Sequence, residues 1–139
     1  MTTLDDCKLV KLKKISDPRG NLTFIESGMD LQFAIKRIYY IYDVPSGEYR
    51  GAHAHKCLEQ LMIAVSGSFD VSLDDGKSKK VITLNNPAIG LYIPKMIWRE
   101  MENFSSGSVC LVLASDHYDE HDYIRNYNEF LKMEGLECI

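Results

Sequence analysis

Short runs of strand-forming residues, separated by turn signals, fill most of this sequence. One run, FAIKRIYYIYDV at positions 33–44, is rich in β-branched and aromatic residues, which are enriched in strands. Further along, two runs are divided by DDGK at positions 74–77, an Asp-Gly signal typical of a hairpin turn. Many short strands with frequent turns favour a sandwich or barrel. The sequence therefore predicts an all-β fold.

Only the final stretch of the chain has a helical pattern. In DEHDYIRNYNEFLKM, the side chains of Ile124, Tyr127 and Leu131 recur at spacings of three and four residues, as they would on one face of a helix. Acidic residues crowd the beginning of this stretch, where they favour the positive end of a helix. The pattern predicts a short C-terminal α-helix near residues 120–133.

Length and charge exclude several classes of protein. A chain of 139 residues without a linker, repeat or low-complexity tract fits one domain, so we expect a single domain over residues 1–139. The net charge of −4 argues against nucleic acid as a partner, because proteins that bind it are usually basic. Apolar runs such as VCLVLA are far shorter than a membrane span, so no membrane partner is expected.

The cysteines and the first residues predict a cytoplasmic protein. Cys7, Cys57, Cys110 and Cys138 lie far apart and form no C-x-x-C pair. Interpreted as free thiols, they indicate a reducing compartment. The opening segment MTTLDDCKLVKLKK carries acids and lysines where a secretory signal would be apolar.

Two histidines separated by one residue are the main functional signal. The segment GEYRGAHAHKCLEQ holds His53 and His55, and Glu59 follows. Successive strand residues point to opposite faces, so these side chains are expected to share an inward face with the apolar residues Leu61, Ile63 and Val65. Two histidines and a carboxylate suit a metal. The histidines alone suit proton transfer near neutral pH or a hydrogen-bonded structural pair.

A second strand carries an inward-facing arginine. Alternation along FAIKRIYYI places Arg37 and Tyr39 on one face with the apolar residues Phe33, Ile35 and Ile41. An interior guanidinium is costly unless a protein group or an anionic ligand pairs with it. Arg37 therefore indicates either a buried pair or a site for an anion.

The histidine segment resembles the first motif of the cupin superfamily, in which His-x-His is followed by a glutamate at the position of Glu59. In the second motif, Pro94 of PKMIWREMEN aligns, but Arg99 stands where the superfamily has its fourth metal ligand, a histidine. A guanidinium cannot coordinate a cation and repels it. The resemblance therefore implies a cupin jelly roll, or double-stranded β-helix, that works without a metal.

Three longer blocks extend the resemblance over nearly the whole chain. They are RGAHAHKCLEQLMIAVSGSFDV, GLYIPKMIWREMENFSSGSVCLVLAS and YDEHDYIRNYNEFL, and they look like the small cupin sugar-nucleotide ketoisomerases. That family moves the carbonyl of dTDP-4-keto-6-deoxy-D-glucose from C-4 to C-3. The resemblance implies this dTDP-linked substrate, no cofactor, a homodimer, and a role in making deoxyamino sugars for bacterial surface polysaccharides.

The family reaction suggests roles for individual residues. A proton next to a ketone is removed, an enediolate forms, and the neighbouring carbon is reprotonated. We expect His53 to act at the carbons, His55 at the oxygens and Tyr39 as a hydroxyl relay, with the order of the two histidines left open. Arginines grip phosphate in two places and stabilise an enediolate. The expected substrate-binding residues are therefore Arg19, Arg37, Arg50 and Arg99.

Two other interpretations are open. The chain can be another cupin enzyme, either a sugar-nucleotide epimerase or a metal-dependent oxygenase, although Arg99 argues against the metal. It can also be a non-catalytic sugar-nucleotide-binding cupin, although 139 residues leave no room for the DNA-binding domain that usually accompanies one. Outside the site, His117 and His121 are expected to be solvated, and Trp98 to lie in the core or an interface.

Overall fold

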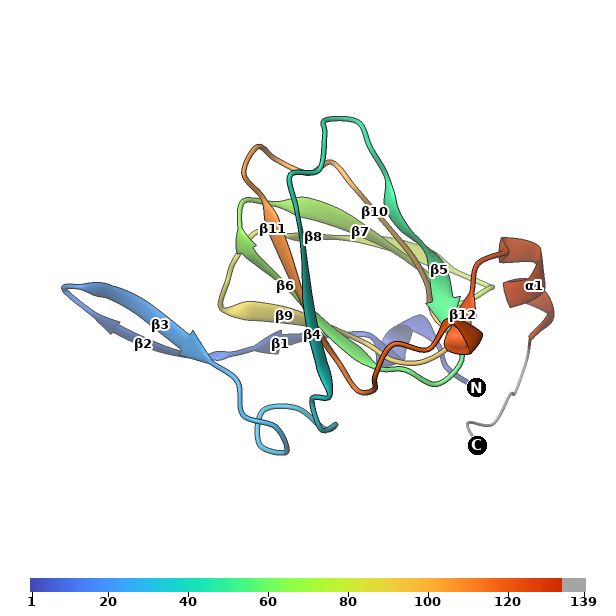
Figure 1. Cartoon of the computed structure of the whole chain (residues 1–139), viewed down its shortest axis with the longest axis horizontal. Coiled ribbons are helices and arrows are strands. Elements are labelled where there is room, and N and C mark those ends of the chain that lie inside the picture. Colours follow the sequence, from blue (N-terminus) through green and yellow to red (C-terminus); the bar gives the residue numbers. More distant parts are fainter. Residues whose placement is uncertain (134–139) are drawn as a thin grey trace.

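The all-β architecture is confirmed by the computed structural model, which describes residues 1–133 of the 139-residue chain. Within that range, two five-stranded antiparallel sheets face each other (Figure 1), in the orders β1-β9-β6-β11-β4 and β12-β5-β10-β7-β8. The first sheet contains β1 (Lys8–Lys11), β4 (Arg37–Tyr42), β6 (Gln60–Ser66), β9 (Ile89–Ile93) and β11 (Val109–Ala114). The second contains β5 (Arg50–His55), β7 (Phe69–Asp74), β8 (Lys79–Leu84), β10 (Trp98–Glu102) and β12 (Tyr123–Ile124).

The main core fills the space between the two sheets. Met62 of β6 and Val112 of β11 meet Val71 and Leu73 of β7, and all four side chains are buried. Burial of such apolar area is the dominant favourable term in folding. This packing sets the position of the two sheets relative to each other. It therefore also sets the positions of the polar side chains on their inner faces.

The outer face of the first sheet carries a second apolar cluster. Leu61 and Ile63 point away from the main core and pack against Leu12, Leu31 and Phe33 from the N-terminal part of the chain. The prediction that Leu61 and Ile63 share a face with the histidines is therefore wrong. Strand β5 ends at position 55 and β6 begins at position 60, so the intervening turn breaks the alternation. The other member of the predicted face, Val65, is exposed.

The C-terminal helix is present, but it is shorter than the pattern predicted. Helix α1 spans Tyr127–Lys132, and a 3-10 turn, η2, spans Glu120–Asp122. Between them, Tyr123 and Ile124 pair with β5 as strand β12, which is why residues 120–126 do not continue the helix. The side chain of Asn126 accepts a hydrogen bond from the backbone of Glu129 and caps α1.

Helix α1 covers the outer face of the second sheet. Phe130 of the helix packs against Trp98 of β10, with ring centroids 5.8 Å apart, and both side chains are buried. The expectation that Trp98 lies in the core is confirmed. Because α1 anchors the end of the segment at residues 115–126, this segment is held across the edge of β5 (Figure 1).

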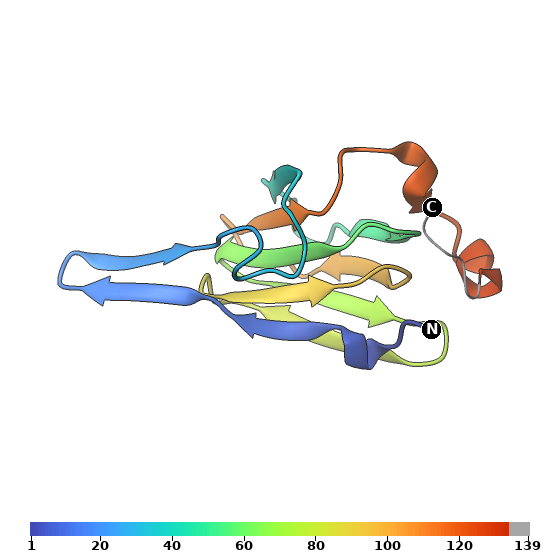
Figure 2. The same cartoon turned by 90° about the horizontal axis from the view of Figure 1, so that it is seen from below.

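A two-stranded hairpin projects from the body of the molecule. It consists of β2 (Lys13–Asp17) and β3 (Gly20–Phe24), and both views show it extending beyond the sheets (Figures 1 and 2). Ile15 and Leu22 lie opposite each other in its register, and each is 56% exposed. The turn at its tip contains Arg19 and uses Gly20 at a φ of 127°, a conformation that favours glycine.

The cysteines differ from the sequence-based expectation. Among the described residues, Cys7 and Cys110 are free and buried, but Cys57 is disulfide-bonded. The interpretation of all four cysteines as free thiols is therefore wrong for Cys57, and it no longer supports a reducing compartment. No helix within residues 1–133 is long and apolar enough to cross a membrane.

Candidate active site

A pocket of about 820 Å³ opens between edge strand β4 and strand β5. This volume lies in the range typical of small-molecule sites. Four of the residues selected from the sequence line it, namely Arg37, Tyr39, Arg50 and His53. Arg37 and Tyr39 alternate on β4, and Arg50 and His53 lie on β5. The fold thus brings residues of two consecutive strands, which belong to different sheets, to one cavity.

His53 is the histidine that lines this pocket. It lies opposite Arg99 in the register between β5 and β10, so both side chains are on the inner face. Its ring contacts His55 edge to face, with centroids 4.8 Å apart. Burial, and then the charge of Arg99, lower the pKa of His53 to about 2. Its imidazole is therefore neutral at neutral pH, which is the form that accepts a proton.

His55 is fully buried behind His53 and is held by a carboxylate. Its Nδ1 lies 2.9 Å from Oδ2 of Asp122. Because an ionised carboxylate only accepts hydrogen bonds, Nδ1 carries the proton and Nε2 keeps its lone pair. Burial lowers the pKa of His55 to about 4, although the hydrogen bond to Asp122 opposes this. Within residues 1–133, Nε2 is a buried acceptor without a hydrogen-bond partner, and His55 is not part of the lining of the larger pocket.

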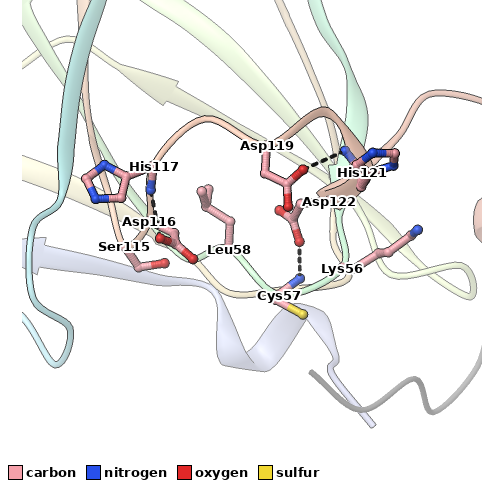
Figure 3. Close-up of a pocket in the computed structure, with 9 residues that line it drawn as sticks. All are labelled: Lys56, Cys57, Leu58, Ser115, Asp116, His117, Asp119, His121 and Asp122. Carbon is pink, nitrogen blue, oxygen red and sulfur yellow. Dashed lines mark hydrogen bonds between the residues drawn. The ribbon is translucent and has the colours of Figure 1, made fainter. Parts of the chain in front are cut away.

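Asp122 is a site residue that the sequence analysis missed. Its Oδ1 accepts a hydrogen bond from the backbone of Cys57 at 2.8 Å, so the carboxylate bridges two segments beside a second, smaller pocket (Figure 3). Burial raises the pKa of Asp122, but the hydrogen bonds from His55 and Cys57 lower it by more, so the net shift is downward. The sequence showed Asp122 only as one of several acids at the start of the predicted helix, with no signal that it would face β5.

The two other histidines lie at the rim of this second pocket. His117 and His121 line it together with Asp116 and Asp119 (Figure 3). Both histidines are exposed, as the sequence analysis expected. They are separated from the larger pocket, whose lining does not include them.

Arg99 lies at the centre of the barrel rather than in the pocket lining. Its side chain is 1% exposed. Its Nη1 donates to Oε1 of Gln60 at 2.6 Å, while Nε and Nη2 both donate to the backbone oxygen of Ile97 at 3.1 Å. Burial lowers the pKa of Arg99 to about 10, so the guanidinium is still charged at neutral pH.

Gln60 is the second residue that the sequence analysis missed. Its Nε2 donates to the hydroxyl oxygen of Tyr39 at 3.0 Å, and its side chain is 1% exposed. Glu59, not Gln60, was expected to point inward, because the alternation of β5 was extended through the turn that precedes β6. Gln60 connects the buried guanidinium of Arg99 to a hydroxyl group in the pocket wall.

The remaining arginines differ in how well they are placed. Within the described residues, Nε and Nη2 of Arg37 are buried without a partner. Its guanidinium lies 5.3 Å and 5.5 Å from the rings of Tyr39 and Tyr118. Arg50 is exposed at the rim of the pocket. Arg37 therefore has the free donors that recognition of an anionic ligand requires.

Of the two remaining arginines, one lines the pocket and the other does not. Arg125 lines the pocket, although the sequence analysis did not select it. It pairs with Glu120 at 2.7 Å and stacks over Tyr123 at 4.3 Å. Arg19 pairs with Asp17 at 2.8 Å on the projecting hairpin and is not part of the pocket lining in a single chain.

The residues present do not fit the metal centre that the cupin motif implies. Glu59 does not face the histidines: it accepts hydrogen bonds from the hydroxyl group of Tyr92 and from Gln32. The expectation that Glu59 shares their face is therefore wrong. The three-residue donor set is not assembled, and the guanidinium of Arg99 faces His53 from the neighbouring strand. A fixed positive charge at that place opposes binding of a cation.

Comparison with known proteins relates this site to sugar-nucleotide enzymes. The model of the family described as FdtA, WxcM-like, C-terminal, matches residues 5–135. The TDP-4-oxo-6-deoxy-α-D-glucose-3,4-oxoisomerase of Aneurinibacillus thermoaerophilus is 52% identical over 125 residues, which are 90% of each chain.

Solved structures show the same relationship. A variant of the 3,4-ketoisomerase QdtA from Thermoanaerobacterium thermosaccharolyticum, in complex with TDP-4-keto-6-deoxyglucose, is 46% identical over 94% of each chain, with a TM-score of 0.92. The TDP-quinovose 3,4-ketoisomerase WlaRB of Campylobacter jejuni is 55% identical over 92% of this chain and 98% of its own, with a TM-score of 0.88. The dTDP-4-dehydrorhamnose 3,5-epimerase of Bacillus anthracis, 16% identical at a TM-score of 0.76 over 88% of this chain and 79% of its own, shares only the fold.

Proposed function

The chain belongs to the FdtA family, and on that premise we propose that it is a TDP-sugar 3,4-ketoisomerase. Its substrate is TDP-4-keto-6-deoxyglucose, whose carbonyl group it moves from C-4 to C-3. The observation that carries the proposal is the pair of neutral histidines beside a pocket with unpaired polar groups, in a chain 52% identical to an oxoisomerase of this specificity. The reaction is a tautomerisation, so it needs proton transfer but neither an oxidant nor a reductant.

His53 is the proposed acid and base at the carbons. The proton at C-3 is acidified by the C-4 carbonyl, and the neutral imidazole of His53 takes it, leaving an enediolate across C-3 and C-4. The imidazolium exchanges this proton with solvent and then protonates C-4. Its low pKa in the free protein, caused by burial and then by Arg99, would rise when a diphosphate brings negative charge into the pocket. Substrate binding therefore favours the charged intermediate state of His53.

Tyr39 and His55 are proposed to act at the oxygens. During the reaction the hydroxyl group at C-3 loses a proton, and the oxygen at C-4 gains one. Tyr39 can do both in one step, giving its proton to one oxygen as it accepts from the other. The unpaired Nε2 of His55 is the alternative acceptor. Asp122 would then act through His55, because it fixes which nitrogen carries the proton.

We predict that the purified protein introduces solvent deuterium into its product. In heavy water, TDP-4-keto-6-deoxyglucose should give a 3-keto product that carries deuterium at C-4, observed by NMR. The His53→Asn variant should lose turnover, since asparagine keeps a polar group but cannot take the proton. Treatment with EDTA should leave the activity unchanged, because no step uses a metal.

The matched control is His117→Asn, which replaces an exposed histidine outside the pocket lining and should keep full activity. Loss of wild-type activity on chelation, restored by iron, would favour a metal-dependent cupin. Binding of the nucleotide sugar without any exchange of its hydrogens would favour a non-catalytic module. A 3,5-epimerase would instead exchange the hydrogens at C-3 and C-5 and leave the carbonyl at C-4.

Arg37 is the proposed main contact for the diphosphate, with Arg50 as a second contact at the rim. We predict that Arg37→Ala weakens TDP binding by about 2 kcal/mol, roughly 30-fold, the scale of a lost charge-assisted contact. Isothermal calorimetry measures this directly. Lys36→Ala removes an equal charge from an exposed neighbour outside the pocket lining and should bind TDP normally. Equal affinities for the two variants would place the diphosphate elsewhere.

A homodimer is proposed as the functional form. An isolated two-stranded hairpin is marginally stable in water, and the hairpin β2-β3 exposes Ile15 and Leu22. A second copy of the chain would cover these side chains. Light scattering at micromolar concentration should give twice the mass of 15.9 kDa, and a monomer would contradict the proposal.

The substrate class supports the predicted cytoplasmic location and the predicted role in polysaccharide biosynthesis.

A further inference from the structure

Three side chains form a continuous hydrogen-bonded path from the buried centre of the barrel to the pocket. Nη1 of Arg99 donates to Oε1 of Gln60 at 2.6 Å, and Nε2 of Gln60 donates to the hydroxyl oxygen of Tyr39 at 3.0 Å. Arg99 and Gln60 are each 1% exposed, whereas Tyr39 lines the pocket. The path therefore ends at a residue of the pocket wall.

The direction of every bond in this path is determined by Arg99. A guanidinium has only donors, so it requires the carbonyl oxygen of the Gln60 amide to face it. The amide nitrogen of Gln60 must then face Tyr39, and this nitrogen also has only donors. The hydroxyl oxygen of Tyr39 consequently accepts, and its own hydrogen is directed away from Gln60.

The hydrogen of the Tyr39 hydroxyl group has no acceptor among the described residues. Among residues 1–133, the hydrogen bond from Gln60 is the one that the Tyr39 hydroxyl group makes. Burial raises the pKa of Tyr39. The charge of Arg99 and the hydrogen bond from Gln60 lower it, but only in part, so the net shift is upward. The phenol thus keeps its proton at neutral pH, beside the pocket it lines.

We propose that Gln60 is a positioning residue, which makes Tyr39 an obligatory hydrogen-bond donor to the substrate oxygen on which negative charge develops. This inference rests on the proposed ketoisomerase function and deepens it. Tyr39 is the catalytic residue, because it touches the substrate, and Gln60 acts only through Tyr39. Arg99, selected from the sequence for substrate binding, contributes here by orienting Gln60.

The test reverses the direction of the path with one nearly isosteric change. In Gln60→Glu, both side-chain oxygens accept, so the carboxylate binds Arg99 and takes the hydrogen of the Tyr39 hydroxyl group for itself. The substrate oxygen loses its donor. We expect kcat and kcat/KM to fall together by roughly 10- to 100-fold, as when one oxyanion donor is removed, while the affinity for TDP in calorimetry stays within twofold.

A double-mutant cycle separates positioning from a merely structural role. Tyr39→Phe should lose a similar factor in kcat. At pH 8, where His53 is neutral even without the charge of Arg99, Gln60→Glu should cost nothing further in the Tyr39→Phe background, since the hydrogen it captures is gone. Thermal unfolding of each variant shows that folded protein is compared. Should Gln60→Glu fail to fold, Tyr39→Phe alone decides, because a fully active Tyr39→Phe overturns the inference.

The other outcomes are equally decisive. A folded Gln60→Glu variant with wild-type kcat would overturn the inference, and so would independent, multiplicative losses in the double variant. Active wild-type protein in the heavy-water assay shows that the ketoisomerase function itself holds, so these results would then overturn the role of Gln60 alone. An inactive wild-type protein would overturn both proposals.

Discussion

The buried guanidinium of Arg99 is the interaction on which the site depends. It lies 1% exposed between the two sheets, and no carboxylate within the described residues forms a salt bridge with it. Removing such a charge from water costs several kcal/mol unless its donors are satisfied. Each of its three nitrogens donates one hydrogen bond, to the backbone of Ile97 or to Gln60, and these bonds offset part of that cost. The barrel thus carries a fixed positive charge at the place where the cupin motif would supply a metal ligand.

This charge organises the chemistry of the pocket in two ways. Together with burial, it keeps His53 and His55 neutral, so they can accept protons. Through Gln60 it also determines which way the hydroxyl group of Tyr39 points. A metal bound by the two imidazoles would have occupied their lone pairs and prevented them from accepting protons. In this site the guanidinium of Arg99 supplies the positive charge that a metal ion would otherwise supply. Because the histidines then need not coordinate a metal, they stay available for proton transfer on the same strands.

The sequence predicted the elements of this site better than their connections. Strand alternation placed Arg37 and Tyr39 on one inward face, and the histidine pair was recognisable from its spacing alone. Glu59 was placed wrongly, and Gln60 was missed, because a turn of irregular conformation separates β5 from β6 and alternation does not extend through it. Asp122 was missed for a different reason. Its approach to His55 depends on the pairing of Tyr123 and Ile124 with β5, a contact between distant segments that leaves no local pattern.

The most direct test of this account is the protonation state of the two histidines, measured by nitrogen-15 NMR of the imidazole rings in the free protein. Both folded-state pKa values lie below the ordinary value, at about 2 for His53 and about 4 for His55. At pH 5.5, where an ordinary histidine is mostly charged, both rings should therefore be neutral, with the proton of His55 on Nδ1. In Arg99→Met, which removes the charge, the pKa of His53 should rise. Titration of both rings near pH 6.5 in the wild-type protein would contradict the account.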